Sequence, residues 1–170
     1  MRDSRTPVFL QSKIKDIAGL LPLAAEVTAS GGKIVFTNGC FDILHYGHAL
    51  YLQEAAGLGD ILVVGINTDA SVRRLKGKSR PVVPQQYRAA LVAALQSVDF
   101  VVLFDEDTPY NLIKALSPDV LVKGGDWRKE DIVGSDIVEA RGGRVVPLKF
   151  VEGFSTSSII DKIVQSYAKQ

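Results

Sequence analysis

Apolar and polar positions follow two alternating spacings along most of the chain, and these predict strands and helices in succession. Short apolar runs rich in β-branched residues, such as Ile61–Asn67 (ILVVGIN), are typical of strands that are covered on both faces. Between these runs apolar residues recur every three or four positions, which is typical of helices with one buried face. The strands predicted in this way are Lys33–Thr37, Ile61–Asn67, Phe100–Phe104, Val120–Lys123 and Arg144–Leu148.

The predicted helices begin at capping residues or proline and end at glycine or proline. They cover Gly47–Ala56, Gln85–Gln96, Pro109–Leu116, Ser135–Arg141 and Ser155 to about Tyr167. Residues 12–30 are predicted to form one or two short amphipathic helices, and residues 68–83 a polar, basic loop. This alternation predicts a doubly wound α/β fold: a five-stranded parallel sheet with helices on both faces. We expect a helical extension over residues 1–31 and a domain over residues 32–170.

Composition excludes several classes of protein. The chain has 170 residues, of which 46% are hydrophobic and 23% charged, as in ordinary globular domains rather than disordered or fibrous chains. One cysteine excludes a disulfide framework and a cysteine-based zinc site. A net charge of +1 gives no support to a nucleic-acid partner. No apolar run approaches the ~18 residues that cross a bilayer, so no membrane partner is expected.

The N-terminus resembles a secretory signal in outline, because Arg2 and Arg5 precede the apolar stretch Ile17–Ala25. However, charged residues lie directly before and after this stretch, and Pro22 interrupts it. Short amphipathic helices are the favoured interpretation. The cytoplasm is the expected compartment, and the lone Cys40 agrees with it.

Ligands of doubly wound sheets bind beyond the carboxyl ends of the strands. The loops to consider are therefore 38–48, 68–83, 105–108, 124–134 and 149–157. A dinucleotide-binding GxGxxG is absent after the first predicted strand, and Val72 replaces the first glycine that a P-loop ending in Gly77-Lys78-Ser79 requires. Serine-hydrolase and zinc-protease motifs are also absent.

Both histidines of the chain, His45 and His48, lie in the first of these loops. A lone histidine is usually a core or surface residue, but two at i and i+3 at a helix start face the same way. The free N–H groups of the helix start add positive potential. Gly47 allows a phosphate to approach the backbone closely. Gly39 serves either a tight turn alone or a turn that admits a nucleotide. This arrangement predicts a cradle for polyphosphate oxygens.

The pattern Gly39-x-Phe41-Asp42-x-x-His45-x-Gly47-His48 resembles the signature of the HxGH nucleotidyltransferases, the cytidylyltransferase-like group. The resemblance covers about Lys33 to Ile160. Residues 80–83 (RPVV), 120–127 (VLVKGGDW) and 131–134 (DIVG) are similar to the heptose 1-phosphate adenylyltransferase branch. That activity is often fused to a sugar kinase, and a chain of this length resembles the stand-alone form. The implied reaction is attack by a sugar 1-phosphate on the α-phosphorus of ATP, with Mg²⁺ carried by the ATP and no metal ligands from the protein.

The resemblance also implies roles for individual residues. The implied catalytic residues are His45, His48 and Lys78. The implied nucleotide-binding residues are Thr37, Asn38, Gly39, Cys40, Phe41, Asp42, Gly47, Lys123, Gly124, Asp126, Ser155, Thr156 and Ser157. The implied sugar-phosphate ligands are Lys76, Arg80 and Arg88.

Several of these residues have alternative interpretations. Arg88 is either a phosphate clamp or an ordinary surface arginine. Asp42 orients a histidine, binds hydrated Mg²⁺ or braces its loop. Ser155 also suits a helix cap. We expect Trp127 to serve packing. The family commonly has a basic residue close behind its last Ser/Thr cluster, whereas here Lys162 comes later.

Two other functions compete with heptose adenylylation. One is a related enzyme such as a glycerol 3-phosphate cytidylyltransferase, and the other is a nucleotide-binding regulator without turnover. The partners expected are ATP and heptose 1-phosphate. A homodimer is also expected if the apolar N-terminal helix is exposed.

Overall fold

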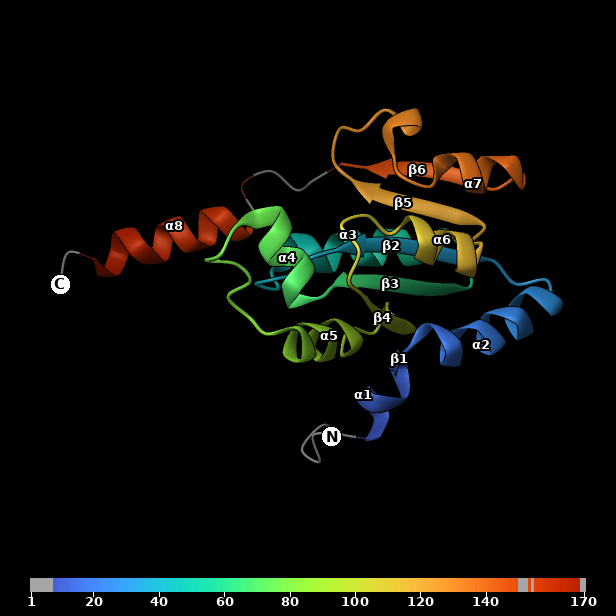
Figure 1. The fold of residues 1–170 in the computed structure, drawn as a ribbon, viewed down its shortest axis with the longest axis horizontal. Coiled ribbons are helices and arrows are strands. Elements are labelled where there is room, and N and C mark those ends of the chain that lie inside the picture. The colour runs from blue at the N-terminus through green and yellow to red at the C-terminus, as the bar shows by residue number, and fades with distance from the viewer. Residues whose placement is uncertain (1–7, 150–152, 154, 169–170) are drawn as a thin grey trace.

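A parallel sheet lies between two layers of helices in the computed structural model, which describes residues 8–149, 153 and 155–168 (Figure 1). The described residues form six strands in the order β1-β4-β3-β2-β5-β6, and all neighbouring pairs are parallel. The strands are β1 Ile14–Lys15, β2 Ile34–Gly39, β3 Ile61–Asn67, β4 Phe100–Phe104, β5 Val120–Gly124 and β6 Arg144–Leu148. The predicted doubly wound α/β class is confirmed.

The predicted number of five strands was wrong, because β1 adds a sixth at the edge of the sheet. This strand has two residues, with Ile14 opposite Val101 and Lys15 opposite Val102 of β4. Two residues carry no readable periodicity, so only the pairing with β4 identifies them as a strand. Strand β2 also continues to Gly39, two residues beyond its predicted end.

The helices mostly follow the prediction, but the first half of the predicted loop 68–83 is helical. The helices are α1 Val8–Lys13, α2 Ile17–Ala29, α3 Tyr46–Ala56, α4 Asp69–Lys76, α5 Gln85–Ala93, α6 Tyr110–Leu116, the 3₁₀ turn η1 Lys129–Asp131, α7 Ser135–Ala140 and α8 Thr156–Tyr167. Thr68 is the N-cap of helix α4, and its side chain accepts from the N–H of Ser71. Val72 is its one buried apolar residue, too little for a helical pattern to be visible in the sequence.

Successive side chains of a strand point to opposite faces of the sheet, so each strand contributes to two separate apolar layers. Ile34 and Phe36 of β2 join the layer under α2, α6 and α7, whereas Val35 joins the layer under α3 and α5. Continuous apolar strands are needed because both faces of the sheet are covered.

The described part of the predicted N-terminal extension is joined to this core. Leu20 of α2 is fully buried with Phe36, and β1 completes the sheet. The boundary after residue 31 stays a prediction. Within the described residues, no helix is long and apolar enough to cross a membrane.

Candidate active site

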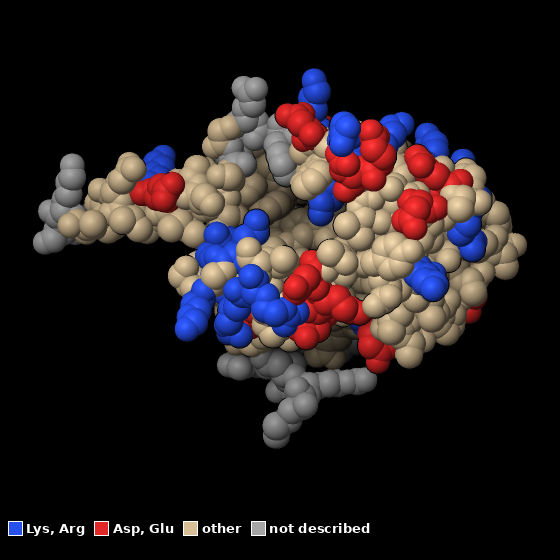
Figure 2. Space-filling model, turned by 45° about the horizontal axis from the view of Figure 1, so that its top comes forward, with Lys and Arg blue, Asp and Glu red and all other residues tan. Residues whose placement is uncertain are grey.

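A cleft of about 850 Å³ opens at the carboxyl ends of the strands. Each of the five predicted loops contributes to its lining, and the volume suits a small-molecule ligand. Figure 2 shows a hollow on this face with Lys and Arg side chains gathered along one side. Exposed basic residues at the end of α4 and just beyond it include Arg73, Arg74, Lys76 and Lys78.

Most of the predicted site residues line this cleft, and a few do not. Those that line it are Asn38, Gly39, Cys40, Phe41, Asp42, His45, Gly47, His48, Lys76, Arg80, Lys123, Gly124, Ser155, Thr156 and Ser157. Thr37, Lys78, Arg88 and Asp126 lie outside the lining. The ligand that each residue contacts stays a prediction.

The two histidines are stacked on each other at the start of α3. Their ring centroids are 3.8 Å apart with 23° between the ring planes, and the ring of Phe41 lies 5.1 Å from that of His48. His45 is the N-cap of α3, and its carbonyl accepts from the N–H of His48. The loop between β2 and α3 thus presents both rings together with the positive end of the helix.

Both rings have unused hydrogen-bonding capacity. The Nδ1 atoms of His45 and His48 are buried without a partner among the described residues. Burial lowers the pKa of His48 to about 4, with a further contribution from His45, and burial also lowers the pKa of His45. Both imidazoles are therefore neutral at neutral pH in the unliganded protein. Negative charge placed beside them would raise both pKa values.

Helix α3 is anchored one turn beyond His48. The hydroxyl of Tyr51 is hydrogen-bonded to Oγ1 of Thr37 on β2, and burial raises the pKa of Tyr51 to about 12. Thr37 itself is fully buried, so it supports the cleft from below rather than facing a ligand. The predicted nucleotide contact of Thr37 is therefore not available to its side chain.

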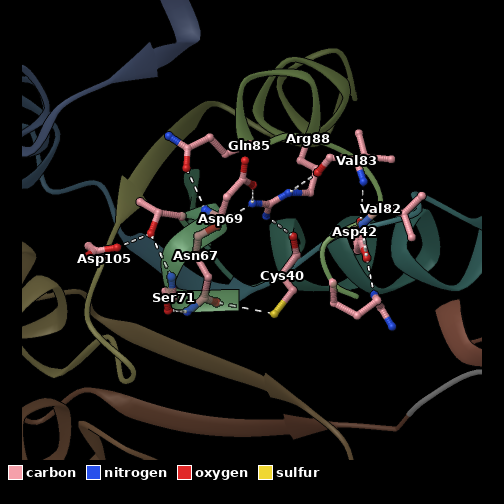
Figure 3. Close-up of polar contacts among 12 residues, drawn as sticks. Cys40, Asp42, Asn67, Asp69, Ser71, Val82, Val83, Gln85, Arg88 and Asp105 are labelled. Carbon is pink, nitrogen blue, oxygen red and sulfur yellow. Dashed lines mark hydrogen bonds and ion pairs between the residues drawn. The ribbon is translucent and has the colours of Figure 1, made fainter. Parts of the chain in front are cut away.

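Of the three roles considered for Asp42, the structure shows the bracing one. Its buried carboxylate accepts from the backbone N–H groups of Val82 and Val83, 2.8 Å away, and from Nε of Arg80 (Figure 3). Burial alone would raise the pKa of Asp42, but these donors outweigh it and keep the pKa below its usual value. The segment after α4 is thereby fastened to the histidine loop.

Asp42 has little capacity left to bind a Mg²⁺ ion directly. Both oxygens of Asp42 already accept hydrogen bonds, and no group of three His, Cys, Asp or Glu suited to a metal is found in the described part of the chain. That Mg²⁺ arrives only with the phosphates of the substrate stays a prediction.

The predicted phosphate contact of Arg88 is contradicted by its surroundings. Arg88 lies on α5 and is fully buried. All three nitrogens donate to protein oxygens: Nε to the carbonyl of Val83, NH1 to that of Cys40, and NH2 to the carbonyl of Asn67 and to Oδ1 of Asp69 (Figure 3). Arg88 therefore joins the histidine loop, the end of β3 and the start of α4, and neither a clamp nor a surface arginine describes it.

Three other cations face the cleft: Lys76, Arg80 and Lys123. Nζ of Lys123 has one weak hydrogen bond, 3.5 Å from Oδ1 of Asn38. Burial lowers the pKa of Lys123, and the nearby Lys76 lowers it further, while Cys40 acts in the opposite direction. No carboxylate pairs with Lys123 among the described residues, so an anion in the cleft is its natural partner.

Two residues in the segment after β5 lie in other surroundings than the sequence predicted. Asp126 is exposed outside the cleft, whereas Trp127, expected to serve packing, is 49% exposed and lines it. Sequence reasoning also missed Tyr51, Asn67 and Val133 as lining residues. The signal for Trp127 was its position three residues after Gly124, which was assigned to the nucleotide.

Helix α8 brings a serine-rich end to the cleft. Ser155 accepts from the N–H of Ser158, and Oγ of Ser158 accepts from the N–H of Ser155, which together form a capping box. The predicted cap at Ser155 is confirmed. Ser155, Thr156 and Ser157 line the cleft as well, so the cap and a ligand-facing role coexist.

Comparison with known proteins agrees with this geometry. Residues 36–162 match the family described as Cytidylyltransferase-like. Bifunctional protein HldE of Citrifermentans bemidjiense is 60% identical over 156 residues, which are 92% of this chain and 32% of that protein. HldE of Geobacter metallireducens is 55% identical over 159 residues, 94% of this chain and 32% of the relative. The chain thus spans about a third of the length of these relatives.

Two solved structures are also similar. The lipopolysaccharide core biosynthesis protein of Thermoplasma volcanium is 32% identical with a TM-score of 0.58, covering 71% of this chain and 98% of that one. Pantoate-β-alanine ligase of Francisella tularensis has a TM-score of 0.60, 14% identity and coverage of 92% and 79%, so it shows the fold alone. The histidine motif, the cleft and these matches lead to one conclusion: the chain belongs to the cytidylyltransferase-like family.

Proposed function

We propose that the chain transfers the adenylyl group of ATP to D-glycero-β-D-manno-heptose 1-phosphate, forming ADP-heptose and pyrophosphate. The observation that carries this proposal is the stacked His45–His48 pair, whose Nδ1 atoms have no partner among the described residues, in a cleft that Lys76, Arg80 and Lys123 also line. The choice of heptose rests on residues 80–83, 120–127 and 131–134 and agrees with 60% identity to HldE. We assign the activity to residues 32–170.

The chemistry needs alignment and charge stabilisation more than a base. The second pKa of a phosphate monoester is about 6, so the acceptor is mostly dianionic at neutral pH and already nucleophilic. An oxygen of the acceptor phosphate forms a bond to the α-phosphorus, and the bond from that phosphorus to the bridging oxygen breaks. Pyrophosphate leaves with the electron pair of that bond. No proton has to be removed from the nucleophile.

The residues of the cleft divide this work. The polyphosphate raises the pKa of His45 and His48, and their N–H groups donate to oxygens on which charge develops. Lys76, Arg80 and Lys123 neutralise and align the two anions, and Lys78 joins them from the neighbouring exposed segment. MgATP is the form of the nucleotide that we expect as substrate.

Pyrophosphate release separates the candidate functions. The parent chain is incubated with ATP or CTP and a panel of sugar and polyol phosphates, and the product is identified by mass. Release with ATP and heptose 1-phosphate supports the proposal, whereas release with CTP and glycerol 3-phosphate supports the related enzyme. Nucleotide binding without any release supports a regulator.

Location and assembly are further proposals. The cytoplasm is proposed on the ground of the single cysteine, and no nucleic-acid partner is proposed. The expected homodimer depended on an exposed N-terminal helix, but Leu20 and Ala24 of α2 are buried in the protein's own core. Sedimentation of the purified chain measures the assembly directly.

A further inference from the structure

Trp127 is the one tryptophan of the chain, and its indole ring is placed unusually for so large an apolar group. The residue is 49% exposed, and it lies in the lining of the cleft. Its Nε1–H donates to the carbonyl of Gly124 at the end of β5, 3.2 Å away. The ring is thus tied to the sheet while much of its surface stays open to a ligand.

The cleft divides by chemistry on either side of β2. Strand β3 is one neighbour of β2, and the segment after it brings the cations Lys76 and Arg80 to the cleft. Strand β5 is the other neighbour, and the segment after it brings Trp127, Ile132 and Val133, of which Val133 is 41% exposed. The histidine pair follows β2 itself and therefore lies between a cationic half and a half in which these apolar groups join one cation, Lys123 of β5.

The two substrates differ in the same way. A sugar phosphate is polar on all sides and suits the cationic half. A nucleobase presents flat, weakly solvated faces, and aromatic side chains stack on such faces. The triphosphate that joins the base to the reacting centre would then run from Trp127 towards His45 and His48.

We propose that Trp127 stacks on the base of the nucleotide, and that this contact makes it a specificity-determining residue that favours a purine. The inference rests on the proposed function, since it takes ATP as the nucleotide. A purine covers more of the indole ring than a pyrimidine, so stacking strengthens binding of adenine relative to cytosine. Val133, which is 41% exposed, adds apolar surface to the same half of the cleft.

The single tryptophan makes the contact directly observable. Intrinsic emission is followed while adenosine, ATP, cytidine, inorganic tripolyphosphate or heptose 1-phosphate is added, with excitation at the red edge of the indole band where adenine does not absorb. We expect adenosine and ATP to quench the emission strongly and cytidine to quench it weakly. Tripolyphosphate and heptose 1-phosphate leave it unchanged. Equal quenching by tripolyphosphate, quenching by the sugar phosphate alone, or no quenching at saturating ATP overturns the proposal.

Variants test the energetic side. Loss of a base-stacking ring weakens nucleotide binding by roughly 10- to 100-fold, so Trp127→Ala is expected to raise the Kd of ATP by that factor, measured by calorimetry. Trp127→Phe retains part of the affinity, and the Kd of tripolyphosphate stays the same in both variants. Tyr87→Ala is a matched control, because Tyr87 is 48% exposed and lies outside the cleft lining. An unchanged Kd of ATP in Trp127→Ala contradicts the proposal.

These results are separable from the reaction itself. Binding and emission are measured without turnover, so a chain that stacks adenosine but releases no pyrophosphate refutes the proposed function and leaves the role of Trp127 standing. A chain that turns over ATP while its tryptophan emission stays unaltered supports the proposed function and refutes the role of Trp127.

Discussion

Replacing Arg88 with methionine tests the residue whose predicted role differs most from its surroundings in the structure. Methionine keeps an unbranched apolar side chain, shorter than that of arginine, and has no N–H donors. The substitution leaves the carbonyls of Val83, Cys40 and Asn67 and the carboxylate of Asp69 without the donors that now satisfy them. The histidine loop thereby loses its connection to the end of β3 and the start of α4.

The expected loss of stability follows from these contacts. A buried group left without its hydrogen-bond partner costs roughly 1–3 kcal/mol, and breaking a buried ion pair costs about 3–5 kcal/mol. The side chain of Asp69 is 22% exposed, so water compensates part of its loss. We expect Arg88→Met to lower the free energy of unfolding by about 3–5 kcal/mol, which lowers the Tm by roughly 6–20 °C for a chain of this size.

Urea unfolding and thermal melting measure this loss, and substrate kinetics complete the comparison. Arg73→Met is the matched control, because Arg73 is an exposed arginine on α4, and it is expected to change the stability by less than about 0.5 kcal/mol. An Arg88→Met chain as stable as its parent, with a raised KM for the sugar phosphate, would refute the bracing role and restore the phosphate clamp.

Three further predictions concern pH, the basic segment and proton uptake. The pKa of His48 is about 4 in the folded chain, below its ordinary value of ~6.5, so the unfolded chain binds the proton first as pH falls. Urea unfolding should therefore show a stability loss on the order of 1 kcal/mol at about pH 5, allowing for partial solvent screening, and a smaller loss in His48→Ala. Lys78→Ala should lower kcat or raise KM in the pyrophosphate assay with stability within about ±0.5 kcal/mol, and a large fall in Tm would show that Lys78 is structural. ATP binding should take up protons at neutral pH, so its calorimetric enthalpy should vary with the ionisation enthalpy of the buffer; a buffer-independent enthalpy contradicts the raised histidine pKa values.

The elements with strong periodicity could be predicted from the sequence. Strand β3 is predicted over Ile61–Asn67 and found there, because a seven-residue apolar run buried on both faces has few alternatives. Strand β1 could not be predicted, since its existence depends on pairing with β4. Helix α4 has one buried apolar residue, Val72, and its basic residues had indicated a loop.

In the candidate site too, residues of a local motif could be predicted, whereas residues whose surroundings depend on tertiary packing could not. His45, Gly47 and His48 form a local motif at a strand end, and the structure brings them to the cleft. Arg88 and Trp127 were assigned the wrong surroundings, because residue type does not show what lies on the next element. A buried arginine that donates to three carbonyls and an exposed indole at a cleft are both products of tertiary packing.

The measurement closest to the central claim is the rate of pyrophosphate release by the parent and by His48→Ala, with heptose 1-phosphate and either ATP or CTP at matched concentrations. The account predicts turnover with ATP, little with CTP, and a kcat lower by roughly 10²-fold or more in His48→Ala, with a smaller change in the KM for ATP. A preference for CTP would contradict the adenylyl assignment. Equal kcat values for the parent and His48→Ala would contradict catalysis by the histidine pair.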